Sequence, residues 1–159
     1  MNSSRKMLLF GGLSLAAFGM LYGLHYAVFT EHQTLDRMGG SLAQAFVHAA
    51  DRNMQQAKAA IDVYASTKFD YVRQVDVHSH WIGLAMLLIV FGAAYDGVAL
   101  SERWKLRIAA GLTAGSFLFP LGVILQTISH NDAYASALAI LGSTIVTAGS
   151  TAVAWGFAR

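Results

Sequence analysis

The sequence contains no cysteine, and this absence removes several classes of site. Disulfide bonds, thiolate metal ligands, covalently attached c-type haem and cysteine nucleophiles all require that residue. Only 13% of the 159 residues are charged, and there is a single proline. A formal net charge of +2 is too small to favour a nucleic-acid partner. Neither a disulfide scaffold nor a nucleic-acid-binding surface is therefore expected.

What the chain has instead is apolar sequence, at 55% of its residues. A soluble domain of this length would leave too much of that surface in water. A helix needs roughly 20 apolar residues to cross a hydrocarbon core about 30 Å thick. Four stretches meet this requirement, namely Met7–Phe29, Trp81–Leu100, Leu106–Ile128 and Ala135–Phe157. We expect an all-α integral membrane protein, a single domain over residues 1–159 that forms a four-transmembrane-helix bundle in the lipid bilayer.

Charge near the predicted spans indicates their orientation. The first apolar run is longer than a signal-peptide core and has no small-residue cleavage site, so it is expected to remain in the protein. Lys and Arg lie before span one, between spans two and three, and after span four, at Arg5, Lys6, Arg103, Lys105, Arg107 and Arg159. By the positive-inside rule these positions are cytoplasmic. The sequence thus predicts a multi-pass protein of the cell (inner) membrane with both termini in the cytoplasm.

Residues 30–77, between spans one and two, form the one sizeable polar region and are expected outside. Apolar residues recur there at helical spacing, from Leu35 to Tyr64. Because both ends return to one membrane surface, we expect an amphipathic helical hairpin that reverses near Asp51–Gln55 or at Gly39-Gly40. Such a hairpin is either a solvated cap over the mouth of the bundle or a lid or docking surface for a partner.

Small residues within the spans recur every four positions, which lets helices approach closely in lipid. Gly19 and Gly23 form one such pair, and Ala139, Ser143, Thr147 and Thr151 form another row. We expect the hydroxyl groups of this row to bond to carbonyls one turn earlier. Asp96 falls toward the cytoplasmic end of span two, where it is either interfacial or functional.

All six histidines fall on the predicted outer side. His32 and His48 belong to the polar region and are expected to be solvated. The other four lie at the ends of spans, at His25, His78, His80 and His130. Imidazole is a common ligand of iron, copper and zinc. These four residues are either interfacial side chains or a metal or cofactor site.

Helix geometry limits which histidines can cooperate. Residues two apart on a helix point about 200° apart, so His78 and His80 cannot both face one bundle interior. Trp81 and Ala85 share the face of His78, and a flat aromatic beside a small residue suits a planar ligand. The cofactor-binding candidates are therefore His78, His80, His25, His130, Trp81 and Ala85, with His78 as the metal ligand.

Three metal centres are compatible with these residues. Zinc is disfavoured because no HExxH-like spacing exists, although Asp76 and Asp132 are carboxylates on the outer side. Copper bound by His78, His80 and His130 stays open. Haem b is favoured, since it needs one imidazole, apolar helices around the ring, and cations such as Arg73 or Lys68 for its propionates.

Two short motifs, Val77–Ser79 at the start of an apolar run and Arg103–Lys105 after the next interval, carry a resemblance to a known family. With its four-span plan the chain resembles the styrene oxide isomerases, membrane enzymes related in architecture to haem-copper oxidase helices. The resemblance covers spans two and three. It implies a haem b between subunits of a homotrimer, with iron bound by His78 and acting as a Lewis acid that opens a small apolar epoxide to an aldehyde. The family's substrate-orienting asparagine falls on Leu84, and its third-span tyrosine has no counterpart in 106–128.

Three functions remain open from sequence. The first is a haem b protein of isomerase type, acting on a small apolar substrate. The second is a b-type electron carrier with a redox partner, in which His25 or His130 supplies a second axial ligand. The third is a cofactor-free accessory subunit that docks through residues 30–77.

Overall fold

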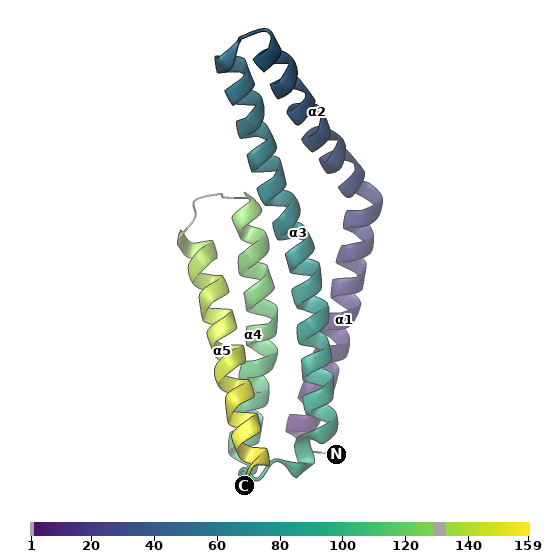
Figure 1. Cartoon of the computed structure of the whole chain (residues 1–159). Helices are drawn as coiled ribbons and strands as arrows, with labels where there is room; N and C mark the ends of the chain where they lie inside the picture. The colour runs from purple at the N-terminus through teal and green to yellow at the C-terminus, as the bar shows by residue number, and fades with distance from the viewer. Residues whose placement is uncertain (1, 129–132) are drawn as a thin grey trace.

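The computed structural model describes residues 2–128 and 133–159, and within these ranges the chain is helical with no strand. Five α-helices and one 3₁₀ turn follow one another along it (Figure 1): α1 Ser3–Phe29, α2 Glu31–Ala50, α3 Met54–Ala94, η1 Tyr95–Gly97, α4 Glu102–Ile128 and α5 Ala133–Phe157. Four of these segments are long and apolar enough to cross a membrane, namely α1, α3 with η1, α4 and α5. The predicted helical class and its four apolar segments are confirmed.

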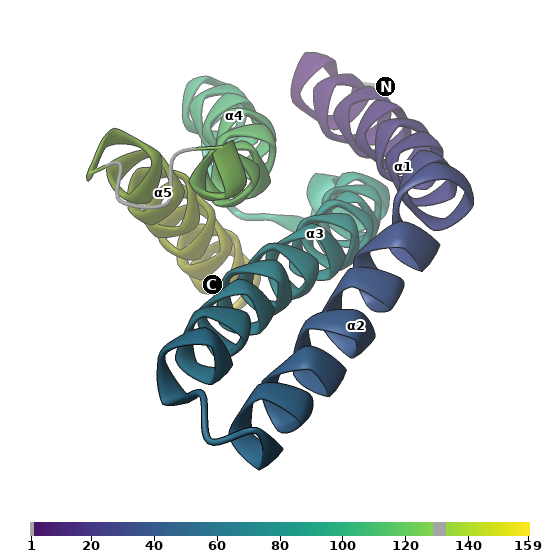
Figure 2. The same cartoon turned by 90° about the horizontal axis from the view of Figure 1, so that it is seen from above.

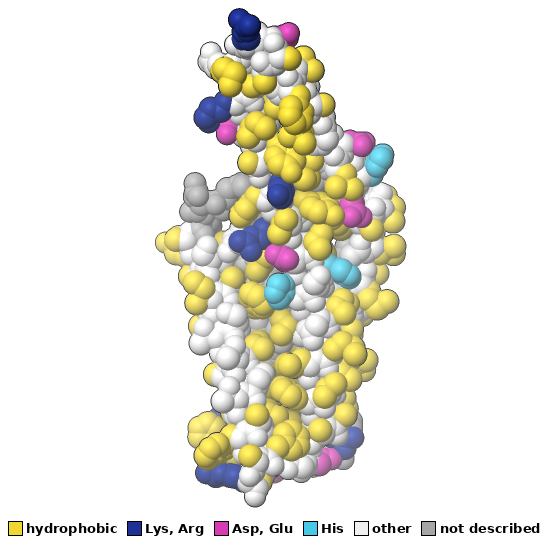
Figure 3. Space-filling model, viewed as in Figure 1, with side chains coloured by type: hydrophobic (Ala, Val, Ile, Leu, Met, Phe, Trp, Pro, Cys, Tyr) yellow, Lys and Arg dark blue, Asp and Glu magenta, His cyan; other side chains and the backbone are white. Residues whose placement is uncertain are grey.

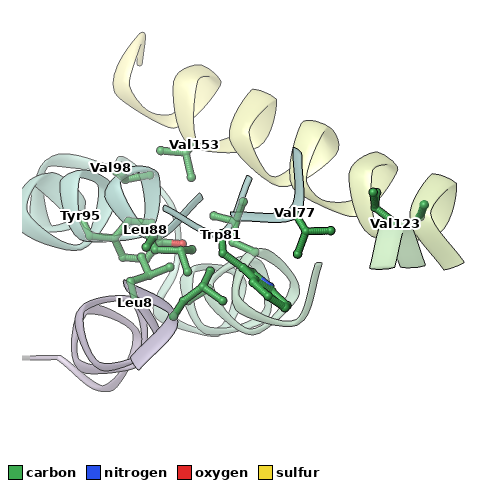
Figure 4. Packing of buried hydrophobic residues seen from close by; sticks show 13 residues of the cluster. Leu8, Val77, Trp81, Leu88, Tyr95, Val98, Val123 and Val153 are labelled. Carbon is green, nitrogen blue, oxygen red and sulfur yellow. The ribbon is translucent and has the colours of Figure 1, made fainter. Parts of the chain in front are cut away.

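The helices pack as two antiparallel pairs (Figures 1 and 2). α1 lies along α3 and α4 lies along α5, while α3 and α4 join the two pairs. Both termini lie at the same end of the molecule as the α3–α4 connection, which we call the basic end. Buried side chains from all four long helices make up the core, including Leu8 on α1, Leu88 on α3 and Val153 on α5 (Figure 4).

Glycines bring the helix backbones close together. A Cβ at Gly142 of α5 would overlap the backbone of Phe119 on α4, and a Cβ at Gly122 of α4 would overlap the backbone of Ala139 on α5. The same close approach joins α1 to α3, where a Cβ at Gly12 would lie 2.9 Å from the carbonyl oxygen of Ala85. Backbone contact of this kind is how helices pack where no water drives them together.

Helix α3 joins two regions that the sequence analysis treated separately. It runs unbroken for 41 residues, so the second half of the predicted outer region 30–77 and the span predicted to begin at Trp81 belong to one continuous helix. No glycine or proline interrupts the chain between Met54 and Gly83, and the helix therefore continues. At about 1.5 Å per residue, α3 is roughly twice as long as a hydrocarbon core is thick.

At its other end α3 stops at Ala94, and the predicted helical span to Leu100 is wrong over its last residues. The 3₁₀ turn η1 follows, and the Tyr95 hydroxyl donates to the carbonyl of Lys105 at 2.8 Å. Asp96 pairs with Arg5 of α1 at 2.7 Å and is half exposed. Asp96 thus ties the N-terminus of α1 to the end of α3 at the basic end.

The chain reverses between α2 and α3 at Asp51–Asn53, the first of the two positions predicted. Arg52 adopts a left-handed conformation with φ 58°, and the Asn53 N–H bonds to the His48 carbonyl at 2.8 Å. This is a Schellman ending to α2 in which arginine stands where glycine is usual, while the Asn53 side chain caps α3. Gly39-Gly40 lies inside α2 instead.

We call α2 together with residues 54–77 of α3 the projecting arm. Small residues form the contact between its helices, among them Ala45, Ala57 and Ala60, whereas larger apolar side chains such as Leu35 and Phe46 are exposed. α2 contacts α3 and, more sparsely, α1. Because α3 carries the arm past the ends of α4 and α5, the arm does not close over the bundle (Figure 1).

Most of the apolar surface is not buried inside the chain. At most 39% of any of the four apolar segments is buried, and Phe10, Met20 and Ile140 are each about two-thirds exposed or more. Along α3 no charged residue lies between Asp76 and Asp96. Figure 3 shows a face with Lys, Arg, Asp and Glu above and at the lower edge and a broad uncharged band between them. This distribution is compatible with a multi-pass membrane protein.

Candidate functional site

His78 lies near the middle of α3 and is half-buried against α1. Its Nδ1 is 2.9 Å from the carbonyl oxygen of Gly19. A carbonyl oxygen only accepts, so Nδ1 carries the proton that is donated. In the neutral ring, Nε2 then has a free lone pair, which is the form that binds a metal.

The α1 backbone makes room for this ring. A Cβ at Gly23 would overlap the imidazole of His78, and one at Gly19 would lie 3.1 Å from Cβ of Trp81. The predicted pair of glycines four residues apart therefore forms the surface on which His78 rests. Any larger residue at Gly23 would displace the imidazole.

Beyond His78, toward the basic end, the contact between α3 and α1 is aromatic and closed to solvent. Trp81 is 3% exposed and Ala85 is fully buried. Trp81 meets Phe18 and Tyr22 edge to face, with ring centroids 4.7 and 5.0 Å apart. Within the described residues, the Trp81 Nε1 and the Tyr22 hydroxyl are buried without a hydrogen-bond partner. Such atoms are uncommon in native structures and mark a place where a bound polar group or water gains hydrogen bonds.

His80 points to the other side of α3. Its Nδ1 bonds to the carbonyl of Asp76 in the same helix, and its ring meets Phe119 of α4 edge to face at 4.6 Å. The predicted divergence of His78 and His80 is thus present, with His78 on α1 and His80 on α4. The two side chains predicted to share a copper ion with His130 are therefore not brought together within the described part of the chain.

The remaining histidine candidates do not join His78. His25 is exposed and lies beside Phe29, with ring centroids 5.4 Å apart. It is two residues beyond Gly23, so it projects from the side of α1 that faces away from His78. His130 lies outside the described residues. Among the described residues, no group of three or more His, Asp or Glu side chains is placed to hold a metal ion.

The charged candidates are engaged elsewhere. Arg73 pairs with Asp76 at 4.0 Å, and its guanidinium lies 5.1 Å from the ring centre of Phe69. It is about 140° around the helix from His78. Lys68 lies 5.9 Å from the ring centre of Tyr64 and is almost three turns from His78. Arg73 therefore lies off the face of His78 and Lys68 lies far from it along the helix, while Asp132 lies outside the described residues.

Sequence reasoning identified His78, Trp81 and Ala85 on one face of α3 but not the residues of α1 that complete it. Tyr22 was missed because a tyrosine in an apolar run carries no signal of its own. Its three-residue spacing from Gly19 places both on the face of α1 that meets α3, and this spacing could have identified it. Family models, curated proteins and solved structures were all compared with the chain, and none matches it.

Proposed function

We propose that the chain is a multi-pass membrane protein that binds haem b, which would be held by Nε2 of His78. The observation that carries the proposal is the hydrogen bond from His78 Nδ1–H to the Gly19 carbonyl at 2.9 Å. Metal-binding histidines usually donate their second N–H to a carbonyl or carboxylate, which fixes the ring and makes the ligating nitrogen more basic. The donor therefore fits the group.

The residues around His78 support a site with one open position on the metal. Among the described residues, the candidates His25 and His80 project away from His78, so neither is brought beside it. A haem held by His78 would supply a Lewis acid for an epoxide oxygen. In this chain Gly19 orients the ligand, while Trp81 and Tyr22 exclude water and offer unpartnered donors.

Within the described residues, none of five surface hollows is lined by a histidine. These hollows have volumes of about 450 to 630 Å³ and are lined mainly by residues of α1, α3, α4 and α5. We therefore propose that a second copy closes the site, as the resemblance to styrene oxide isomerases implies for a homotrimer. That copy would also supply the cations for the propionates, because Arg73 lies off the face of His78 and Lys68 is almost three turns away.

The reaction proposed is the isomerisation of a small apolar epoxide that enters from the lipid. Leu84 and the absence of tyrosine from α4 mean that the family's positioning groups are not present. The Tyr22 hydroxyl and the Trp81 indole N–H are the buried donors available in their place. We expect the purified protein to convert styrene oxide. We expect Tyr22→Phe to lose this activity while it retains the haem.

The orientation proposed has the basic end in the cytoplasm and the projecting arm outside. This orientation follows from the six Lys and Arg residues at the basic end and the positive-inside rule. His78 then lies at the outer edge of the uncharged band, where α3 leaves the bilayer.

The first experiment is an absorption spectrum of the detergent-purified protein, oxidised and dithionite-reduced, after expression with haem supplied. His80→Ala is a matched control, because His80 is half-buried on the same helix and also bonds through Nδ1 to a carbonyl. We expect a five-coordinate Soret band in wild type and His80→Ala that disappears in His78→Ala and returns in His78→Gly with added imidazole.

Other spectra would redirect the proposal. A six-coordinate bis-histidine spectrum would indicate an electron carrier whose second ligand comes from another copy. A colourless wild-type protein would refute the haem proposal and leave an accessory role. A band that survives in His78→Ala and is lost in His80→Ala would place the ligand on the α4 side of α3.

A further inference from the structure

At the basic end, α4 and α5 form the walls of an apolar groove with a volume of about 630 Å³. Its floor is made of small residues, including Ala148 and Ala152 of α5, and two tryptophans flank it. Trp104 of α4 is 56% exposed and Trp155 of α5 is 60% exposed. Indole rings at this depth are typical of the interface between lipid headgroups and acyl chains.

Each tryptophan carries an arginine on its face. The guanidinium of Arg107 lies 5.2 Å from the ring centre of Trp104, and that of Arg159 lies 5.0 Å from the ring centre of Trp155. Stacking occupies the flat face of a guanidinium and leaves its N–H groups free to donate in the plane. The two arginines thus present donors beside the two tryptophans that line the groove.

Two other cations at this end are already paired with carboxylates. Arg5 pairs with Asp96, and Lys105 pairs with Glu102 at 3.7 Å. Among the described residues, neither Arg107 nor Arg159 has a carboxylate side chain within ion-pair distance. An anion therefore has two unneutralised guanidinium groups available beside this groove.

We propose that the groove is a binding site for an anionic phospholipid. One acyl chain lies between Trp104 and Trp155 over the small residues of α5, and the phosphate accepts hydrogen bonds from Arg107 and Arg159. Charge complementarity selects an anionic lipid over a zwitterionic one, whose choline would lie beside the same two cations. The site requires that α4 and α5 face the bilayer, and it does not depend on haem binding.

The test uses tryptophan fluorescence of the full chain in vesicles of unlabelled phosphatidylcholine containing a small fraction of one brominated lipid. Bromine on an acyl chain quenches an adjacent indole, and the third tryptophan, Trp81, is 3% exposed and serves as a shielded reference. A basic residue near an anionic headgroup contributes about a fivefold factor in affinity. With two arginines, we expect brominated phosphatidylglycerol to be preferred over brominated phosphatidylcholine by roughly tenfold or more.

Substitutions distinguish binding at this groove from a general effect of positive charge at the basic end. Arg107→Gln with Arg159→Gln should abolish the preference. Lys6→Gln removes a charge from the same end, at a separate hollow of about 530 Å³ between α1 and α4, and should leave the preference unchanged. Far-ultraviolet circular dichroism of each variant checks that the helices are intact.

Each outcome has a distinct meaning. Equal quenching by the two brominated lipids in wild type would overturn the anionic site, and so would an equal loss of preference in Lys6→Gln. If the ligand is a lipid, the preference for brominated phosphatidylglycerol should persist in 10 mM inorganic phosphate, an excess chosen to compete. Loss of that preference in phosphate would indicate a free-phosphate site instead. No quenching of Trp104 or Trp155 by either lipid would show that this surface does not face acyl chains, and would overturn the proposed membrane insertion as well.

Discussion

Replacing Gly142 with alanine tests whether α4 and α5 pack backbone to backbone. The new Cβ would overlap the backbone of Phe119, with its Cα at 2.7 Å and the carbonyl carbon of Leu118 at 3.0 Å. A main chain inside a helix cannot rotate away from this contact. To restore an ordinary separation of about 3.5–4.0 Å, the two helices would have to move apart by about 1 Å.

The change in unfolding free energy caused by Gly142→Ala is the sum of two opposing contributions. Overpacking of this kind costs about 1–3 kcal/mol, while alanine is favoured over glycine inside a helix by about 1 kcal/mol. Gly83 of α3 supplies the matched control, because a Cβ there would meet nothing within 4 Å. Since the helix preference is common to both substitutions, the difference in unfolding free energy between Gly83→Ala and Gly142→Ala isolates the packing cost, about 1–3 kcal/mol.

The assay is unfolding by sodium dodecyl sulfate in mixed micelles, followed by ellipticity at 222 nm and by tryptophan emission. We expect Gly142→Ala to unfold at a lower fraction of sodium dodecyl sulfate than Gly83→Ala. Because α5 packs mainly on α4, separation of this pair should loosen α5 as a whole. Equal midpoints for the two variants would refute the close contact at Gly142.

Two further predictions concern orientation and the turn at the basic end. Because the chain has no cysteine, single cysteines can be introduced and labelled on intact cells with a membrane-impermeant maleimide. Gln44→Cys in the projecting arm should react directly, whereas Ser101→Cys should react only after the cells are permeabilised. The reverse pattern would show that the proposed topology is inverted. Tyr95→Phe removes a buried hydrogen bond of 2.8 Å to the first turn of α4, so the same detergent unfolding should show a loss of about 1 kcal/mol. An unchanged midpoint would mean that this bond does not hold the turn.

Sequence predicted the elements whose physics is local. Length and hydropathy identify the four apolar segments because crossing a bilayer depends on a sum over about 20 residues. The hydroxyl groups of α5 were predicted to bond within their own helix, and Ser143 and Thr151 do bond to the carbonyls of Ile140 and Thr147 at 2.9 Å. Each of these features depends on residues within one turn or one segment.

Boundaries were less predictable where polarity and backbone geometry give different answers. The sequence placed the end of the polar region at Val77 but did not show that one helix runs through it, because hydropathy depends on the surrounding solvent and not on the backbone. The backbone continues because nothing in the sequence stops it before Gly83. Conversely, Gly39-Gly40 was a candidate for the turn but lies inside α2. The left-handed residue in the actual turn is Arg52. A single strained residue costs only about 1–2 kcal/mol, which the packing of two helices offsets.

The candidate site shows most clearly where local reasoning ends. Helical phase alone dictates that His78 and His80 face opposite sides of α3, and it cannot say which of them meets α1. That choice depends on how α1 and α3 align, which is a contact between residues 59 positions apart. Gly19 and Gly23 favour His78, since a Cβ at Gly23 would overlap its imidazole and the Gly19 carbonyl accepts its hydrogen bond. The glycine pair was visible in the sequence as a packing motif, but its meaning for His78 emerges only when the two helices are set side by side. A functional assignment for this chain therefore depends on α1 as much as on the histidines of α3.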